Sequence, residues 1–115
     1  MVKYFCYVMV LLCISCKTTT IYVVRHAEKE SASAMSGDVP LSAAGQQRAE
    51  ALKDMLINKN ISGIYTTNYI RTRNTAKPLA DALGLTMITY NPGDTSFTSK
   101  IRDHLIGNLL IVGHS

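Results

Sequence analysis

The stretch IYVVRHAE, residues 21–28, decides the fold class. Its first four residues, Ile21–Val24, are apolar and mostly β-branched, which indicates a buried strand. The strand ends at Arg25 and His26, so it brings a guanidinium and an imidazole to the edge where open α/β sheets bind ligands. A histidine placed there is either structural or a nucleophile that attacks phosphorus, with the planar guanidinium binding the phosphoryl oxygens.

Strands and helices alternate along the rest of the chain. Four short apolar runs flanked by turn residues are predicted to be strands: 21–24, 61–66, 86–90 and 109–112. Ser42 caps a first predicted helix, a second runs from Asn68 to Leu83 and ends before Gly84, and a weaker one covers 97–105. This order predicts an α/β fold with a doubly wound, mostly parallel sheet in a three-layer α/β/α arrangement.

The first two predicted helices each carry an apolar stripe at the spacing of an amphipathic helix. We expect the first to face the core with Ala49, Leu52, Met55 and Leu56, and the second with Ala76, Leu79, Ala80 and Leu83. Pro78 should kink the second helix, because its ring displaces the carbonyl of Asn74.

The N-terminal residues have the pattern of an export signal. Residues 4–14 are uncharged and mostly apolar. This run is shorter than a transmembrane helix, which needs about 20 apolar residues, but it matches the apolar region of a signal peptide, which has about 7–15. Ser15 then precedes Cys16, which resembles a bacterial lipoprotein signal whose cysteine is lipidated. We expect a leader over 1–16, a tether over 17–20 and the domain over 21–115, held by a lipid anchor in the bacterial cell envelope at its periplasmic or outer-membrane face. The alternative location is a secreted or soluble periplasmic product. The alternative to a signal is an apolar N-terminal strand.

Cysteine content and charge exclude several classes of site. All three cysteines, Cys6, Cys13 and Cys16, lie in the leader, so residues 17–115 contain none to form a disulfide. No histidine lies near them in sequence, so no zinc site is indicated. The net charge of +4 suits an anionic substrate, and no basic block indicates nucleic acid.

Other predicted strands also end in polar residues. The second yields Thr66 and Thr67 and leads into a helix start with Arg71, and the fourth yields Gly113 and His114. Because parallel strands end at the same edge, these cationic and hydroxyl groups should converge there. With helix N-termini nearby, such a cluster predicts a phosphate pocket.

Together these motifs resemble those of the histidine phosphatase superfamily, which has a phosphoglycerate mutase-like fold. The chain has an Arg-His-Ala motif at 25–27, where glycine is commoner than alanine, and a Leu-Ser-Ala-Ala-Gly segment at 41–45. It also has hydroxyl residues at 66–67 followed by Arg71 and Thr75, and a Gly-His-Ser motif at 113–115. The resemblance extends over 20–115.

The resemblance implies a phosphomonoester hydrolase without a metal or cofactor. His26 would attack phosphorus and become a phosphohistidine, which water would then hydrolyse. Arg25 and Arg71 would bind the phosphoryl oxygens, helped by Thr67 and by His114 in its protonated form. The helix turns about 200° between Arg71 and Arg73, so Arg73 should lie at the rim. We expect Asp38 and His104 to be solvated residues without a role in the site.

The general acid is not evident. Glu28, Asp94 or a residue absent from this chain are candidates, and Glu28 could equally form a structural ion pair. Substrates with good leaving groups could dispense with the acid. The partner would be a phosphorylated small molecule or a phosphoprotein. The alternatives are a protein phosphohistidine phosphatase and a catalytically silent module that binds a phosphorylated ligand, and mutase activity is disfavoured.

The sequence stops one residue after the second histidine motif. Because relatives in the family continue with a further helix and often another strand, we expect the domain to be incomplete at Ser115. This form should then be unstable and weakly active or inactive, with apolar surface exposed near 109–112.

Overall fold

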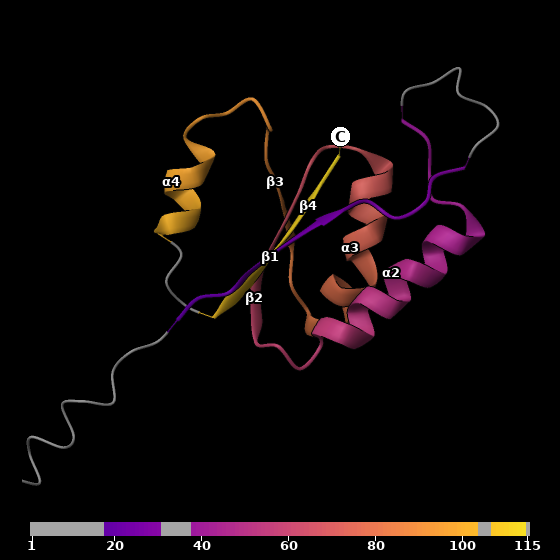
Figure 1. The fold of residues 1–115 in the computed structure, drawn as a ribbon, viewed down its shortest axis with the longest axis horizontal. Helices are drawn as coiled ribbons and strands as arrows, with labels where there is room; N and C mark the ends of the chain where they lie inside the picture. The colour runs from indigo at the N-terminus through magenta and orange to yellow at the C-terminus, as the bar shows by residue number, and fades with distance from the viewer. Residues whose placement is uncertain (1–17, 31–37, 104–106, 115) are drawn as a thin grey trace, which may run out of the picture.

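The computed structural model describes residues 18–30, 38–103 and 107–114. Four strands form one sheet in the order β1-β4-β2-β3, and every neighbouring pair is parallel (Figure 1). The strands are β1 (Ile21–Arg25), β2 (Ile61–Thr66), β3 (Met87–Thr89) and β4 (Asn108–Gly113). The helices are α2 (Ala43–Leu56), α3 (Ile70–Leu83) and α4 (Phe97–Arg102).

The helices cover both faces of the sheet, which confirms the predicted α/β fold and its three layers (Figure 1). Alternate residues of each strand point to opposite faces. The larger apolar cluster lies between the sheet and helices α2 and α3, and includes Ile64, Leu79, Leu110 and Val112. The smaller cluster lies on the opposite face, where Tyr65, Leu109 and Ile111 contact Ile101 of α4.

β1 differs from the expected buried strand. It lies at the edge of the sheet, and only its Tyr22 and Val24 pack against the larger cluster. On its other face Ile21 is 44% and Val23 72% exposed. The α4 cluster includes β2 and β4 residues but none from β1, so one face of β1 stays exposed.

The expectation of exposed apolar surface near 109–112 is wrong. Leu109, Leu110 and Val112 are fully buried and Ile111 nearly so. β4 is an interior strand, with β1 on one side, β2 on the other, and an apolar cluster on each face. Among the described residues, the exposed large apolar side chains lie elsewhere: Ile21 and Val23 on the edge strand β1, Met55 on α2 and Ile88 on β3.

The predicted helix ends are close to those observed. Ser42 caps α2 by accepting a hydrogen bond from the backbone N–H of Gly45, and Gly84 ends α3 at a positive φ of 66°. α3 begins at Ile70 rather than Asn68 and runs on through Pro78. Met55 is not on the inner face: it is 69% exposed, because it lies about 100° around the helix axis from the buried Leu56.

Two other elements are shorter than predicted. β3 covers three residues and α4 ends at Arg102. The predicted leader with Cys16, as well as His104 and Ser115, lies outside the described residues. No helix in the described ranges has both the length and the apolarity to cross a membrane.

Candidate active site

The register of the sheet brings the two predicted histidines to neighbouring positions. Arg25 of β1 pairs with Gly113 of β4, so His26 and His114 leave adjacent parallel strands at the same level. The backbone N–H of His26 donates a hydrogen bond of 3.0 Å to the Gly113 carbonyl, which continues the pairing beyond β1. The predicted convergence of these strand ends is therefore present in the backbone itself.

The hydrogen bond of the His26 ring determines which nitrogen can act as a nucleophile. Its Nδ1 lies 2.7 Å from the backbone carbonyl of Ala27. A carbonyl oxygen only accepts, so Nδ1 must carry a proton. In the neutral ring the lone pair is then on Nε2.

His114 is oriented by a chain of hydroxyl groups. Its Nδ1 lies 3.2 Å from Oγ1 of Thr67, which donates to Oγ1 of Thr72 at 3.1 Å. Thr72 directs its own proton to the backbone carbonyls of Thr67 and Tyr69, both at 2.9 Å. Since the proton of Thr67 is used toward Thr72, Thr67 accepts from His114, whose Nδ1 is protonated. Nε2 of His114 is then a hydrogen-bond acceptor when the ring is neutral and a donor when the ring is protonated.

Thr75 connects the His26 segment to the start of α3. Its buried hydroxyl accepts a hydrogen bond of 2.9 Å from the backbone N–H of Ala27 and donates one of 2.7 Å to the carbonyl of Arg71. The methyl group of Ala27 packs with Leu41 and Ala49. One side chain thus fixes the residue after the histidine relative to the helix that carries the arginine.

Tyr69 belongs to the same cluster, although the sequence did not indicate it. Its ring makes an edge contact with the His114 ring at 4.6 Å between centroids. The guanidinium carbon of Arg71 lies 4.4 Å from the centroid of the same tyrosine ring, a cation–π contact. A tyrosine two residues after a threonine pair carries no distinctive signal, so only the three-dimensional arrangement reveals it.

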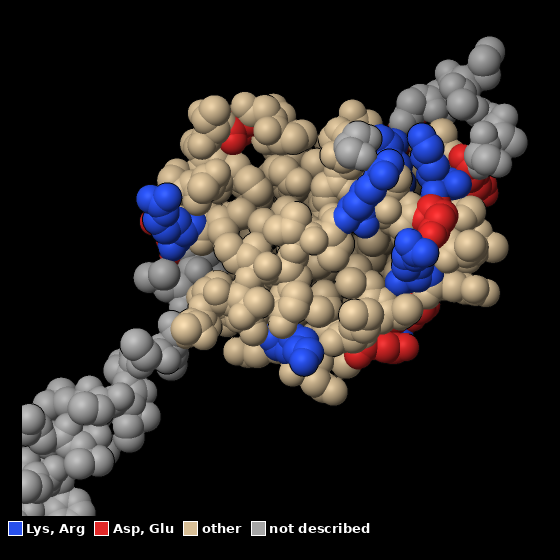
Figure 2. Space-filling model, viewed as in Figure 1, with Lys and Arg blue, Asp and Glu red and all other residues tan. Residues whose placement is uncertain are grey.

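A cationic hollow of about 560 Å³ lies beside His26. Arg25, Lys29 and Arg48 contribute to its walls, together with Glu28. The Glu28 carboxylate forms an ion pair of 2.7 Å with Arg48, the structural role that was considered for it. On the face drawn in Figure 2, Lys and Arg side chains gather on the side of the molecule where β1 and β4 end.

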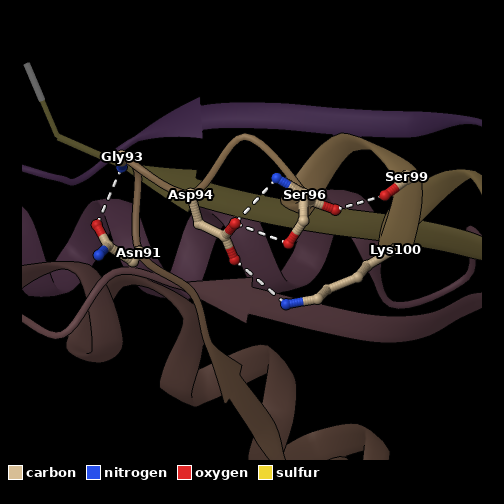
Figure 3. Close-up of polar contacts among 6 residues, drawn as sticks. All are labelled: Asn91, Gly93, Asp94, Ser96, Ser99 and Lys100. Atoms are coloured by element: carbon tan, nitrogen blue, oxygen red, sulfur yellow. Dashed lines mark hydrogen bonds and ion pairs between the residues drawn. The ribbon is translucent and has the colours of Figure 1, made fainter.

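Asp94, the other acid considered, is engaged elsewhere. Its carboxylate accepts hydrogen bonds from the hydroxyl and the backbone N–H of Ser96 and contacts Lys100 at 3.2 Å (Figure 3). These interactions, those of Ser96 first, lower the pKa of Asp94 to about 2. A carboxyl group held ionised in this way cannot donate a proton near neutral pH.

Arg73 and Asp38, which were expected to lie outside the site, differ in their contacts. Arg73 is exposed, as expected for a rim position. Asp38 is not simply solvated: its carboxylate accepts a hydrogen bond of 2.7 Å from the backbone N–H of Ile70 at the start of α3. It thus satisfies one of the free donors of that helix terminus.

Within the described ranges no three His, Cys, Asp or Glu residues lie together as metal ligands would.

The model of the histidine phosphatase superfamily, branch 1, matches residues 21–92. The chain belongs to this superfamily. It is 38% identical over 73 residues to proteins named "Probable phosphoglycerate mutase GpmB" from Yersinia pestis and Yersinia pseudotuberculosis. The match covers 60% of this chain and 34% of those proteins, so it spans about a third of their length.

Solved structures agree on the fold. A protein from Agrobacterium tumefaciens, named as a candidate phosphohistidine phosphatase SixA, superposes with a TM-score of 0.68 at 22% identity, over 86% of this chain and 71% of that one. The protein histidine phosphatase SixA complexed with tungstate gives 0.67 at 18% identity, over 82% and 68%. A mycobacterial glucosyl-3-phosphoglycerate phosphatase gives 0.64 at 15% identity, over 80% and 72%.

Proposed function

We propose that the chain hydrolyses phosphomonoesters through a phosphohistidine formed on His26. The observation that carries this proposal is the fixed tautomer of His26, whose Nδ1–H is bound by the Ala27 carbonyl and whose Nε2 is left as the nucleophile. Nε2 would form a bond to phosphorus while the bond from phosphorus to the leaving-group oxygen breaks. Water would then attack the phosphohistidine, release phosphate and restore the neutral ring.

Charge stabilisation would come from the residues around His26. Arg25 lines the hollow beside it, and Arg71 is fixed against Tyr69 at the start of α3. Negative phosphoryl oxygens close to His114 would favour its protonated form, since a neutral Nε2 would oppose them with a lone pair. His114 would then donate a hydrogen bond in the transition state. Thr67, whose hydroxyl accepts from His114, would act by orienting that ring.

The leaving group would receive little help from carboxylates. In-line displacement places the leaving group on the side of phosphorus opposite the nucleophile. Glu28 shares a hollow with His26 and pairs with Arg48, so it is poorly placed to protonate that group, and Asp94 is held ionised. We therefore expect faster hydrolysis of substrates with good leaving groups.

A protein phosphohistidine phosphatase is the second candidate activity. A phosphohistidine that carries a proton on its second ring nitrogen releases neutral imidazole, a good leaving group, which fits a site with little acid assistance. The likeness of fold to the SixA structures favours the same candidate. A silent module that binds phosphorylated ligands would use the same cationic groups without turnover.

Phosphate release separates an enzyme from a binding module. The chain should release phosphate slowly from p-nitrophenyl phosphate, as expected of a weakly active form, and His26→Ala should abolish release while vanadate still raises the melting temperature of the variant. Protection by vanadate without any turnover in the unmodified chain would identify a binding module. Turnover that survives in His26→Ala would refute the phosphohistidine mechanism.

We also propose that the chain is exported in bacteria and anchored in the cell envelope through lipid on Cys16. The support is the uncharged apolar run that ends at Ser15-Cys16. Cys16→Ser should move the product from the membrane fraction to the soluble fraction and abolish incorporation of labelled palmitate. Cys13→Ser is the matched control and should leave both unchanged. An unlipidated product in the cytoplasm would contradict the proposal.

A further inference from the structure

A second hollow, of about 630 Å³, opens at the same edge of the sheet next to His114. Its walls include Tyr69, Tyr90, Asn68, Asn91 and Pro92, together with His114 itself. We infer that this hollow, named here the tyrosine hollow, binds the leaving group of the substrate and selects an uncharged planar ring. The inference rests on the proposed phosphoryl transfer, and it adds the class of leaving group that the site accepts.

The position of the tyrosine hollow follows from the geometry of displacement. His26 lines the cationic hollow, whereas His114, on the adjacent strand, lines the tyrosine hollow. If the phosphoryl group binds between the two histidines, the nucleophile His26 lies on one side of phosphorus. In-line attack then directs the leaving group to the other side, toward the tyrosine hollow.

The walls of the tyrosine hollow favour neutral groups. Two tyrosines, two asparagines, two threonines and a proline line it together with His114, and no lysine, arginine, aspartate or glutamate is among the described residues that line it. The surface over β3 and the start of α4 is correspondingly mainly uncharged in Figure 2. Two cations lie beside this hollow, a protonated His114 and Arg71 against the Tyr69 ring, and the proposed phosphoryl transfer engages both, so a carboxylate on the leaving group would gain little from them.

Tyr90 is held in place as a platform for a ring. It stacks on Phe97 with 4.2 Å between centroids and 7° between planes, and Phe97 contacts the edge of Tyr65. A Cβ atom at Gly113 would lie only 3.2 Å from the Tyr90 hydroxyl, so this glycine leaves the tyrosine room beside the histidine motif. Burial raises the pKa of the Tyr90 hydroxyl further above neutral pH, so the ring carries no charge. Offset stacking or edge contacts with such fixed aromatic rings favour planar ring ligands.

Binding of phosphonates tests the inference without requiring turnover. The dissociation constant of benzylphosphonate, which presents a neutral ring, is compared by calorimetry with that of 2-carboxyethylphosphonate, which presents a carboxylate. We expect benzylphosphonate to bind about three- to tenfold more tightly, the range expected of one aromatic contact. A peptide carrying phosphonomethyl-phenylalanine then shows whether the ring is accepted as a free molecule or as a side chain, and tight binding of either supports the inference.

Four variants locate the preference. Tyr90→Ala should abolish the difference between the two ligands, whereas Tyr90→Phe should retain it. Ile88→Ala is the control: Ile88 lies on β3 two residues before Tyr90, is 49% exposed and does not line the hollow, so this variant should change nothing. Asn68→Lys, at an exposed position, adds a cation to the wall and should reverse the preference, which provides a second readout if Tyr90→Ala fails to fold.

The results separate the inference from the proposed function. Equal or tighter binding of the carboxylate ligand by the unmodified chain, or a ring preference that survives in a folded Tyr90→Ala variant, would overturn the inference. Phosphohistidine formation on His26 could still be observed in that case. Ring preference without any turnover would support the hollow and count against the phosphatase.

Discussion

Replacing Thr75 by valine tests how the site is assembled. Valine has nearly the shape of threonine but lacks the hydroxyl that accepts the Ala27 N–H at 2.9 Å in a buried position. The helical carbonyl of Arg71 keeps its backbone partner, so the loss falls mainly on the Ala27 N–H. Leaving a buried donor unsatisfied costs about 1–3 kcal/mol. For a domain of about 60–100 residues, each kcal/mol lowers the melting temperature by about 4–8 °C.

The matched control for this variant is Thr75→Ser, which keeps the hydroxyl and removes a methyl group. It should cost about 0.8 kcal/mol, the value of one buried methyl or methylene group. Circular dichroism melts give the stabilities, and hydrolysis of p-nitrophenyl phosphate gives kcat. We expect Thr75→Val to lose both stability and kcat, because Ala27 follows His26 directly, and Thr75→Ser to keep most of kcat. A Thr75→Val variant as stable and active as the unmodified chain would show that the hydrogen bond between the Ala27 N–H and the Thr75 hydroxyl does not hold the site together.

Three further predictions concern the surroundings of the site. Gly45→Ala should destabilise the fold by about 1–3 kcal/mol in a denaturant titration, because its Cβ would overlap the backbone carbonyl of Glu28, while Gln47→Ala on the same helix should be neutral. Asp38→Ala should cost about 1 kcal/mol through loss of the cap on α3, with Asp38→Asn closer to the unmodified chain, and equal stability of all three would show that the cap contributes nothing. The folded pKa of Asp94 is depressed to about 2, so the stability that its charge contributes is present above the unfolded pKa of 3.8 and is lost as the pH falls toward 2. The stability difference between the unmodified chain and Asp94→Asn should therefore shrink over that interval, and a difference constant with pH would contradict the assignment.

The sequence was a good guide wherever the signal was local. An apolar run that breaks at Arg25-His26 identified the strand end, Ser42 the start of α2 and Gly84 the end of α3. Each depends on the conformational preference of a few adjacent residues. The equal register of His26 and His114 followed from parallel pairing, which the alternation of strands and helices indicated.

The errors arose where burial depends on neighbours that are distant in sequence. Nothing in the run Ile21–Val24 distinguishes an edge strand from an interior one, so the exposure of Val23 could not be predicted. β4 was expected to be exposed because no further helix follows it in the sequence, but residues of α2 and α3 pack on Leu110 and Val112, and residues of α4 pack on Leu109 and Ile111. The contacts of Tyr69 with Arg71 and His114 depend on packing that no sequence spacing encodes.

The most direct test of the account is detection of the phosphohistidine. The chain is mixed with p-nitrophenyl phosphate, quenched in alkali within milliseconds, digested and examined by mass spectrometry. We predict a phosphoryl group on the peptide that contains His26, lost on brief treatment with acid and absent from His26→Ala. Release of phosphate without any phosphoryl group on His26, or an acid-stable phosphoryl group at another residue, would contradict the central claim.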